Sequence, residues 1–600
     1  MKSIIIISII LISNTYIFSQ IPTYQWAYSI GDVGQENLDD IATDSENNII
    51  ISGQMYSTTD MDPTEFSEIL YQIGQQDAFI EKFNADGFVE WGLNFGGAYY
   101  DGVYQIAVDK DDNIFAVGYY RGTIDCDPDM VDVANIPGYG GYDMFLVKFD
   151  KNGEFIWAHG FGDVSALDYD DFVNSVAVDD DGSVYITGQF RGSIDFDPGP
   201  DVHAINATIT SIDCFAAKYN ADGEYQWAFR ISGFDGEYGT AITIDNNNDV
   251  IIAGQFEGTA EFSGHLITAA GGEILGYPKE GDVFIAKHNS DDGSYIWAKT
   301  IFGDTEQNAG YSNNAFALKT DADNNIYITG LLYGEGDFDM NDDEFIVTAY
   351  GDYDNYFAKY SPEGDLIWVH TTAPKLPGYN LDMAIDGNND IYLTGFFGYS
   401  TGVPYEADFD FNPDSIYALQ SLGENDIYIA KYDSSAELLW AFSLGGSEYD
   451  YATAIALDND YNICVGGWFF NTDDFDANPD SNFIWLPYTA PDWGDNIWMG
   501  KYKQDGITIP QDTTDNPSGI DEITQNNSFI IYPNPAENNI QLKNVNSELF
   551  NAQIEILNIH GEVINSFVYK NSSIDISALP VGLYFIRIEN EIQKFVKSDF

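Results

Sequence analysis

Carboxylates are the most abundant chemically active side chains of this 600-residue chain, and many of them recur at a fixed spacing. Pairs of aspartates separated by one residue stand between apolar segments. Such oxygen donors suit Ca²⁺, which takes about six to eight of them. The competing interpretation, which we favour, is a turn in which the aspartate accepts backbone hydrogen bonds. The pairs are Asp60/Asp62, Asp125/Asp127, Asp195/Asp197, Asp337/Asp339, Asp408/Asp410 and Asp474/Asp476.

A second candidate site consists of aromatic residues in the stretch NFIWLPYTAPDW, which holds Trp485, Tyr488 and Trp493. Large apolar rings on a loop are costly unless something covers them. They therefore suggest a platform that binds a sugar ring or a protein. The alternative is that these rings pack over the edge of their own domain.

Motifs for catalysis are lacking. The segment 398–402 reads G-x-S-x-G, but that motif needs a preceding parallel strand and a following helix, and the pattern around it is antiparallel. The six histidines are dispersed, and H-E-x-x-H, C-x-x-C and phosphate-binding glycine motifs are absent from the sequence. We nominate no catalytic residue.

The charge balance excludes some partners. With 97 acidic and 23 basic side chains, the formal net charge is −74. A field of that sign repels phosphate backbones, so we expect no nucleic-acid partner. Three scattered cysteines, Cys126, Cys214 and Cys464, form no disulfide framework.

The elements that must position these residues form an internal repeat of 65 to 72 residues. Each repeat predicts two hairpins, with strands A and B joined by a tight polar turn and strands C and D by a turn such as KNGE. Strand A ends in Asp, strand B holds a Gly nine residues later, strand C carries a Lys and strand D a Trp. Four antiparallel strands per repeat are typical of a propeller blade.

The count of strands predicts how the ring closes. Seven A–B–C sets occur, but the first D strand, around Trp26, precedes the first A strand, and no Trp follows the last C strand. We therefore predict a seven-bladed β-propeller whose last blade is completed by the strand around Trp26. This Velcro closure removes an exposed edge. An open solenoid is the alternative.

These repeats resemble the secreted bacterial β-propeller repeat family, in which I-A-x-D, I-Y-x-T-G and D-x-F-x-x-K-x-x-x-x-G-x-x-x-W recur. The resemblance covers residues 24 to about 507. It implies a fold and is nearly silent on activity, since propellers host many functions.

Both ends of the chain indicate export. Lys2 followed by the apolar run 4–12 predicts a signal peptide over residues 1–19, with no membrane-spanning segment left after cleavage. The propeller is expected over 20–507, a polar linker over 508–525 and a further all-β domain over 526–600.

The last segment resembles the type A C-terminal sorting domain of the type IX secretion system. The residues that carry the resemblance are Tyr532–Pro535 with Pro533 and Pro535, the hairpin around Gly561, Leu579–Tyr584 with Gly582 and Tyr584, and the terminal Lys594 and Lys597. The resemblance implies a small immunoglobulin-like sandwich, the type IX machinery as partner, and release from or display on the outer membrane of a Gram-negative bacterium.

From the sequence we favour a non-enzymatic ligand-binding or adhesion module for a glycan or protein. The alternatives are a hydrolase or lyase at the mouth of the propeller channel and a structural component of a surface layer. Calcium is the one candidate cofactor. We expect any ligand on the face that carries the B–C and D–A connections, because the A–B and C–D turns are short and uniform.

Overall fold

A computed structural model describes the chain from residue 21 to 504 and the strands between 530 and 597. Within the first range it leaves out 32–35, 64–67, 130–132, 164–168, 209–210, 270–280, 304–312, 342–343, 372–377, 399–404, 413–414, 471–472, 476–484 and 487–495. The predicted signal peptide and linker lie outside the described residues. The chain divides into two compact units, Met1–Pro510 and Gln511–Phe600. The described residues contain strands and no helix, and so none that could cross a membrane.

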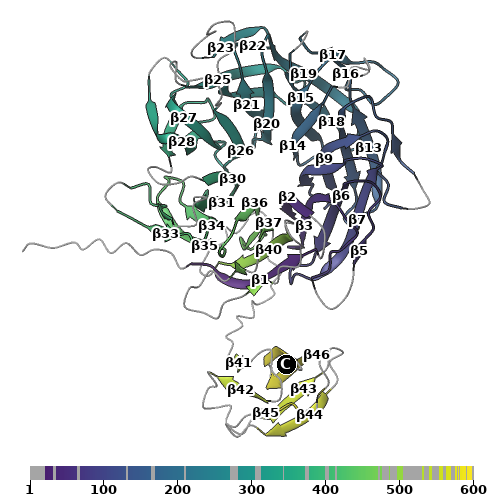
Figure 1. The fold of residues 1–600 in the computed structure, drawn as a ribbon, viewed down its shortest axis with the longest axis vertical. Coiled ribbons are helices and arrows are strands. Elements are labelled where there is room, and N and C mark those ends of the chain that lie inside the picture. Colours follow the sequence, from purple (N-terminus) through teal and green to yellow (C-terminus); the bar gives the residue numbers. More distant parts are fainter. Residues whose placement is uncertain are drawn as a thin grey trace, which may run out of the picture. The chain divides into compact units, whose positions relative to one another are not determined.

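The first unit is a ring of antiparallel sheets whose innermost strands surround a central axis (Figure 1). The prediction of an all-β propeller is confirmed. Groups of four strands follow one another along the chain, each running from the inner to the outer rim. The first groups are β2 (Glu36–Thr43), β3 (Ile49–Met55), β6 (Asp77–Phe83) and β7 (Val89–Gly97); β8 (Gly102–Val108), β9 (Ile114–Arg121), β12 (Tyr142–Phe149) and β13 (Phe155–Phe161); and β14 (Phe172–Val178), β15 (Val184–Phe190), β18 (Asp213–Tyr219) and β19 (Tyr225–Gly233).

The later groups repeat this order. They are β20 (Glu237–Ile244), β21 (Asp249–Phe256), β24 (Asp282–Asn289) and β25 (Tyr295–Gly303); β26 (Asn314–Thr320), β27 (Ile326–Asp337), β28 (Ile346–Tyr360) and β29 (Leu366–Thr371); β30 (Gly378–Ile385), β31 (Ile391–Gly398), β34 (Asn425–Tyr432) and β35 (Leu438–Leu444); and β36 (Asp450–Leu457), β37 (Ile463–Phe469) and β40 (Asn496–Lys503) with β1 (Thr23–Ile30). The pairing of β1 with β40 joins the beginning and the end of the propeller sequence. Ala27, for example, lies opposite Gly500.

Short strands lie between the second and third strand of most groups, and some of them also pair with the last strand of the preceding group. They are β4 (Thr59–Asp60), β5 (Ile69–Leu70), β10 (Ile124–Asp125), β11 (Asn135–Ile136), β16 (Ser193–Asp195), β17 (Ala204–Asn206), β22 (Thr259–Phe262), β23 (His265–Thr268), β32 (Glu406–Asp408), β33 (Ala418–Gln420), β38 (Asp473–Asp474) and β39 (Trp485–Leu486). β10 pairs with β7, and β22 pairs with β19.

The separate hydrogen-bonded sheets are consequently fewer than the seven blades that the sequence predicts. β27 extends beyond its own group and pairs with β25, which merges two groups of strands into one eight-stranded sheet. Counting repeats in the sequence could not predict these hydrogen bonds between groups, because the residues that form them lie in connections of variable sequence. They reduce the number of free sheet edges.

A bulge in every innermost strand sets the direction of its side chains. In β2 the register shifts between Leu38 and Asp40, and the same irregularity recurs in the other inner strands. The repeated glycine of the second strand faces this bulge: a Cβ on Gly53 would lie 1.9 Å from the carbonyl oxygen of Asn37. The glycine is therefore required for close approach of the two backbones, as its spacing predicted.

Buried lysines join neighbouring groups. The ammonium of Lys148 lies 3.6 Å from Asp109 of its own group and donates a hydrogen bond of 3.1 Å to the carbonyl of Ala221 in the next. The indole of Trp157 donates to the same carbonyl. Equivalent ion pairs of 2.7 to 3.2 Å are Lys82–Asp44, Lys287–Asp245, Lys359–Asp321, Lys431–Asp386 and Lys501–Asp458.

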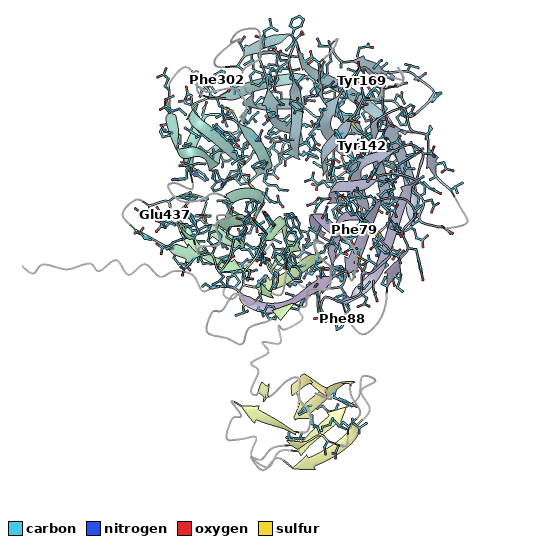
Figure 2. The ribbon with its side chains drawn as sticks, viewed as in Figure 1. Phe79, Phe88, Tyr142, Tyr169, Phe302 and Glu437 are labelled. Atoms are coloured by element: carbon cyan, nitrogen blue, oxygen red, sulfur yellow. The ribbon has the colours of Figure 1, made fainter. Side chains whose placement is uncertain are left out.

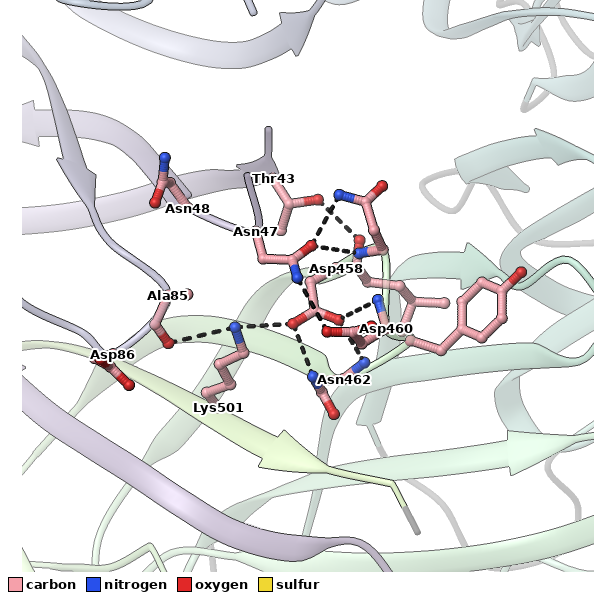
Figure 3. A network of polar contacts seen from close by, with 12 residues as sticks. Thr43, Asn47, Asn48, Ala85, Asp86, Asp458, Asp460, Asn462 and Lys501 are labelled. Carbon is pink, nitrogen blue, oxygen red and sulfur yellow. Dashed lines mark hydrogen bonds and ion pairs between the residues drawn. The ribbon is translucent and has the colours of Figure 1, made fainter. Parts of the chain in front are cut away.

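The seam where the ring closes uses the same contacts (Figure 3). Lys501 Nζ lies 2.8 Å from Asp458 and donates to the carbonyl of Ala85, which belongs to the turn between β6 and β7 of the first group. Asn47 accepts a hydrogen bond from the backbone of Asn459 at 2.9 Å. Apolar side chains fill the space between the sheets (Figure 2), where Phe79 packs in one cluster with Ile41, Ala454 and Met499.

The second unit contains two antiparallel sheets. One has β41 (Ile530–Tyr532), β42 (Asn539–Lys543) and β45 (Ile574–Asp575); the other has β44 (Val563–Val568), β43 (Gln553–Leu557), β46 (Gly582–Ile588) and β47 (Glu591–Lys597). Ile554, Ile556 and Ile586 are buried. Whether these sheets form the expected immunoglobulin-like sandwich stays a prediction.

We predict that replacing Lys501 by Met lowers the free energy of unfolding by about 3–5 kcal/mol, because Asp458 would stay buried without its cation. Thermal and urea unfolding measure the loss. The matched control is Lys503→Met, since Lys503 is exposed on the same strand. Equal stability of the Lys501 variant and the wild type would contradict a role of this ion pair in closing the ring.

Candidate functional site

A cavity of about 140 Å³ lies on the ring axis among the described residues. The bulged positions of the inner strands line it, so each strand contributes a different residue at one register position. These residues are Asp39, Tyr104, Asn174, Thr240, Phe316, Leu381 and Thr453. Unlike the repeated Lys, Asp and Gly, this set is chemically asymmetric, as a site for one ligand must be.

On three inner strands, the side chain of the next residue accepts a hydrogen bond from the backbone of a neighbouring inner strand. Asp40 accepts a hydrogen bond from the backbone N–H of Ile106 at 2.9 Å, and Asp382 accepts one from Ile455 at 3.0 Å. Gln105 Oε1 accepts from Val176 N–H at 2.7 Å in the same way. The carboxylates of Asp40 and Asp382 therefore have a structural role, in addition to facing the cavity.

The charged groups of the cavity are unequally distributed. Three acids, Asp39, Asp40 and Asp382, line the cavity together with one basic residue, Lys319. Burial, followed by the charge of Asp382, raises the pKa of Asp40 to about 7, against the opposing effect of Lys319. Burial and then the charge of Asp40 raise the pKa of Asp39. Gln54 donates a hydrogen bond to the carboxylate of Asp39.

Partly exposed aromatic rings stand near the same end of the inner strands. Tyr451 is the second residue of β36 and stacks on Trp468, near the end of β37, with ring centroids 3.8 Å apart. Phe396 meets Tyr451 edge-on at 4.4 Å. Asn425 donates a hydrogen bond of 2.9 Å to the Tyr451 hydroxyl. These strand ends lead into the D–A and B–C connections, so the rings lie toward the face where a ligand is expected.

A second aromatic cluster borders the cavity on other strands. Tyr104, which lines the cavity, packs against Tyr119 at 4.8 Å. Tyr142 lies 5.5 Å from Tyr119 and 6.0 Å from Phe172, and the guanidinium of Arg121 lies 5.7 Å from the centre of the Tyr142 ring. Aromatic faces, carboxylates and amides together are suited to stack on a ring and to hydrogen-bond its hydroxyl groups.

The paired aspartates of the sequence lie at the linking hairpins. Asp125 Oδ1 accepts hydrogen bonds from Asp127 N–H at 3.2 Å and Ala134 N–H at 2.8 Å, which is the bonding that the turn interpretation requires. The residue between the two acids is buried in each described case. Asp60, Asp195, Asp337 and Asp408 accept the equivalent pair of bonds.

The second acid of four pairs, Asp127, Asp197, Asp339 and Asp410, also has donors from its own turn. Asp197 Oδ1 accepts a hydrogen bond from Gly199 N–H at 2.7 Å, and its Oδ2 lies 2.9 Å from His203 Nδ1. Asp339 Oδ1 accepts from the backbone N–H and the side-chain amide of Asn341, at 3.0 and 3.1 Å. Oxygens of Asp197 and Asp339 are therefore engaged in their own turns. At these two residues the structure favours the turn interpretation.

Whether any of the pairs binds calcium stays a prediction. In the part of the chain that the structure describes, no three His, Cys, Asp or Glu side chains are already arranged to hold a metal ion. Asp474 is described only as part of β38, and Asp476 lies outside the described residues.

The aromatic loop residues of the sequence analysis are largely outside the described range. Trp485 belongs to β39, where its backbone pairs with Asp474, while Tyr488 and Trp493 are not described. Of the sorting residues, Pro533 and Pro535 are not described. Gly582 and Tyr584 lie in β46, and Lys594 and Lys597 lie in β47.

Sequence reasoning missed the rings beside the channel. The sequence signal for these rings is the residue that directly follows the repeated glycine. This residue lies on the same side of each inner hairpin, and its type varies from repeat to repeat. The residues there are Gln54, Tyr119, Gln189, Gln255, Leu331, Phe396 and Trp468.

Two segments match known families. Residues 156–189 match the Beta-propeller repeat, and residues 530–598 match the Secretion system C-terminal sorting domain. The latter match shows that the chain is exported by the type IX secretion system to the cell surface or the exterior, and that it interacts with that machinery.

The relatives found are distant. An uncharacterized WD repeat-containing protein of Acanthamoeba polyphaga mimivirus is 25% identical over 516 residues, which cover 74% of this chain. The match spans only 36% of that relative. The Dos1 propeller covers 80% of this chain and 95% of its own, at 9% identity and a TM-score of 0.35.

PorZ, a surface component of the type-IX secretion system of Porphyromonas gingivalis, covers 95% of this chain and 100% of its own, at 11% identity and a TM-score of 0.20. Both TM-scores lie below 0.5.

We predict that Asp40 makes folding stability pH-dependent. Its pKa is about 7 in the folded protein and about 4 in an unfolded chain, so the folded state holds the proton more tightly. This contribution is complete below about pH 4 and is lost as the pH rises through 7. Relative to Asp40→Asn, the wild type should lose on the order of 4 kcal/mol between pH 4 and 8, since each pKa unit corresponds to about 1.4 kcal/mol.

Urea unfolding at several pH values tests this prediction, with the exposed Asp111→Asn as control. Parallel stability curves for the wild type and Asp40→Asn would contradict it, whereas parallel curves are expected for the control.

A separate prediction concerns export. Removing residues 526–600 should leave the propeller folded but retained in the periplasm, because the segment that the machinery recognises would be absent. Cell fractionation and protease accessibility measure retention, and a melting curve of the retained protein checks its folding. Undiminished surface display of the shortened chain would refute the role of this segment.

Proposed function

We propose that this exported propeller is a non-enzymatic module that binds a carbohydrate on the face of the D–A and B–C connections. The observation that carries the proposal is the stacked pair Tyr451 and Trp468, both partly exposed near the end of the inner strands. The face of Trp468 that is turned away from Tyr451 is a flat surface of the kind on which an apolar sugar face packs.

Polar groups beside the rings supply the rest of a sugar site. Asp39, Asn174 and Thr453 line the axial cavity and offer acceptors and donors for hydroxyl groups. A protein ligand would be expected to need a larger apolar patch than these few partly buried rings provide. The carbohydrate is therefore the favoured ligand of the two classes considered from the sequence.

The ring that presents this face is inferred to have seven blades with the N-terminal strand in the last. Support comes from the four-strand grouping and from the pairing of β1 with β40. The C-terminal segment is proposed to be an immunoglobulin-like sandwich in which the prolines, Gly582, Tyr584 and the terminal lysines form the sorting signal.

The alternative of a hydrolase or lyase at the channel mouth would use the unrepeated acids of the cavity. Asp40 and Asp382 argue against it, since their carboxylates are engaged with backbone N–H groups of the next strand. A purely structural surface-layer role would not require the asymmetric set of side chains around the axis.

We predict that Trp468→Ala weakens binding of the best glycan from an array screen of the mature protein at least about tenfold, because stacking on an aromatic ring contributes roughly 1–3 kcal/mol. Titration calorimetry measures the affinity. Phe88→Ala is the matched control, since Phe88 is an exposed aromatic on the C–D turn between β6 and β7, at the other end of the strands.

Two results would oppose the proposal: no glycan bound at all, or equal affinity of Trp468→Ala and the wild type. The double variant Trp485→Ala with Trp493→Ala tests the loop in the same assay. If only this double variant loses binding, the ligand lies on the loop and not beside the channel.

A further inference from the structure

Glu81 breaks the repeat at a position that is otherwise small and apolar. It lies in β6, and its partner across the strand pair is Gly92 of β7. The other repeats have a small or medium apolar pair at this place. Those pairs are Val147 with Ala158, Ala217 with Ala228, Ala286 with Ala298, Ala358 with Val369, Ala430 with Ala441, and Gly500 with Ala27.

The carboxylate of Glu81 has no hydrogen-bond partner. The residue has 0% of its surface exposed, and neither of its two carboxylate oxygens makes a hydrogen bond within the described structure. An ionised carboxylate that is buried without a partner is strongly unfavourable, so such a group either holds a proton or is paired with a cation. A hydrophobic residue would serve packing better here, as the other repeats demonstrate.

The carboxylate points to the side where other acids gather. A methyl group on Gly92 would lie 3.6 Å from Glu81 Oε1 and 3.4 Å from the Cγ of Glu68. The two glutamates therefore border the same small space, which a methyl group fills in most other repeats. Asp60 is connected to this place, since its Oδ1 accepts a hydrogen bond from Glu68 N–H at 2.9 Å.

The charges of these acids act on Glu81. Burial raises the pKa of Glu81 well above its usual range, and the charges of Glu68, Asp62 and Asp60 raise it further, in that order. Of the paired aspartates described, only Asp60 and Asp62 face a strand that carries such a glutamate; the equivalent residue beside Asp125 and Asp127 is Val147.

We propose that Glu81 and the hairpin residues Asp60, Asp62 and Glu68 bind one Ca²⁺ ion. The donors are all carboxylate oxygens, which favours a hard cation over zinc or copper. The described side chains do not already converge as three ligands. The proposal therefore includes a movement of the hairpin acids toward Glu81 when the ion binds. Export brings the protein to surroundings where modules of about 10⁻⁴–10⁻³ M affinity are useful.

The site lies beside the strand that closes the ring. The pKa of Tyr28 in β1 is raised first by burial and next by the charge of Asp62. An ion held there binds the folded ring and not the unfolded chain, so Ca²⁺ should raise the melting temperature of the whole propeller.

The test uses the mature full-length chain and Ca²⁺ itself, titrated calorimetrically at constant ionic strength with millimolar Mg²⁺ present. We expect one saturable site in the wild type and a rise in melting temperature. The variant Glu81→Ala with Gly92→Ala restores the pair found in other repeats; it should fold and lose both responses. Glu81→Gln should weaken binding at least about tenfold.

Asp127→Asn is the matched control, since it changes the equivalent of Asp62 in a repeat without the glutamate, and it should bind Ca²⁺ as the wild type does. The proposal is overturned if the wild type has no saturable site, or if Glu81→Gln binds equally well. Glu81→Gln keeps the test decisive should the double variant fail to fold.

Discussion

The ring depends on buried ammonium groups that satisfy acceptors of two neighbouring groups of strands at once. A lysine such as Lys148 neutralises the aspartate that ends its own first strand and also binds a turn carbonyl of the next group. Because a buried ion is stable only when its partners are in place, each contact makes one group depend on its neighbour. Where the aspartate is out of reach, as for Lys218, the ammonium lies over the ring of Tyr185, whose hydroxyl binds Asp179.

Where the ring closes, one buried lysine lacks the turn carbonyl that the other groups supply. The last group has no turn between its third and fourth strands, because its fourth strand comes from the N-terminus. Lys431 accordingly finds the side-chain oxygen of Gln504 at 3.4 Å in place of a turn carbonyl, and Gln504 also receives a hydrogen bond from Tyr392. A residue just beyond the last strand thus completes the contacts of the preceding group.

The repeating parts of the molecule could be predicted from the sequence, and the unrepeated parts could not. The spacing of Asp, Gly, Lys and Trp predicted the strands and their pairing, because each type has a physical role that recurs in most groups. The channel set, from Asp39 to Thr453, depends on a bulge whose register no single repeat reveals. Glu81 was missed for a related reason. One glutamate among many acids is unusual only because it is buried, and its burial is known only from the structure.

The order of the chain has a consequence for the timing of maturation. Strand β1 is among the first to emerge during synthesis, yet its partner β40 lies more than 470 residues later. Until β40 arrives, the ring has two open edges that are liable to pair with other chains. The matched sorting segment begins at residue 530, after β40. A nascent chain therefore always contains every strand of the ring before it displays the signal for passage across the outer membrane, which excludes half-made rings from the exit.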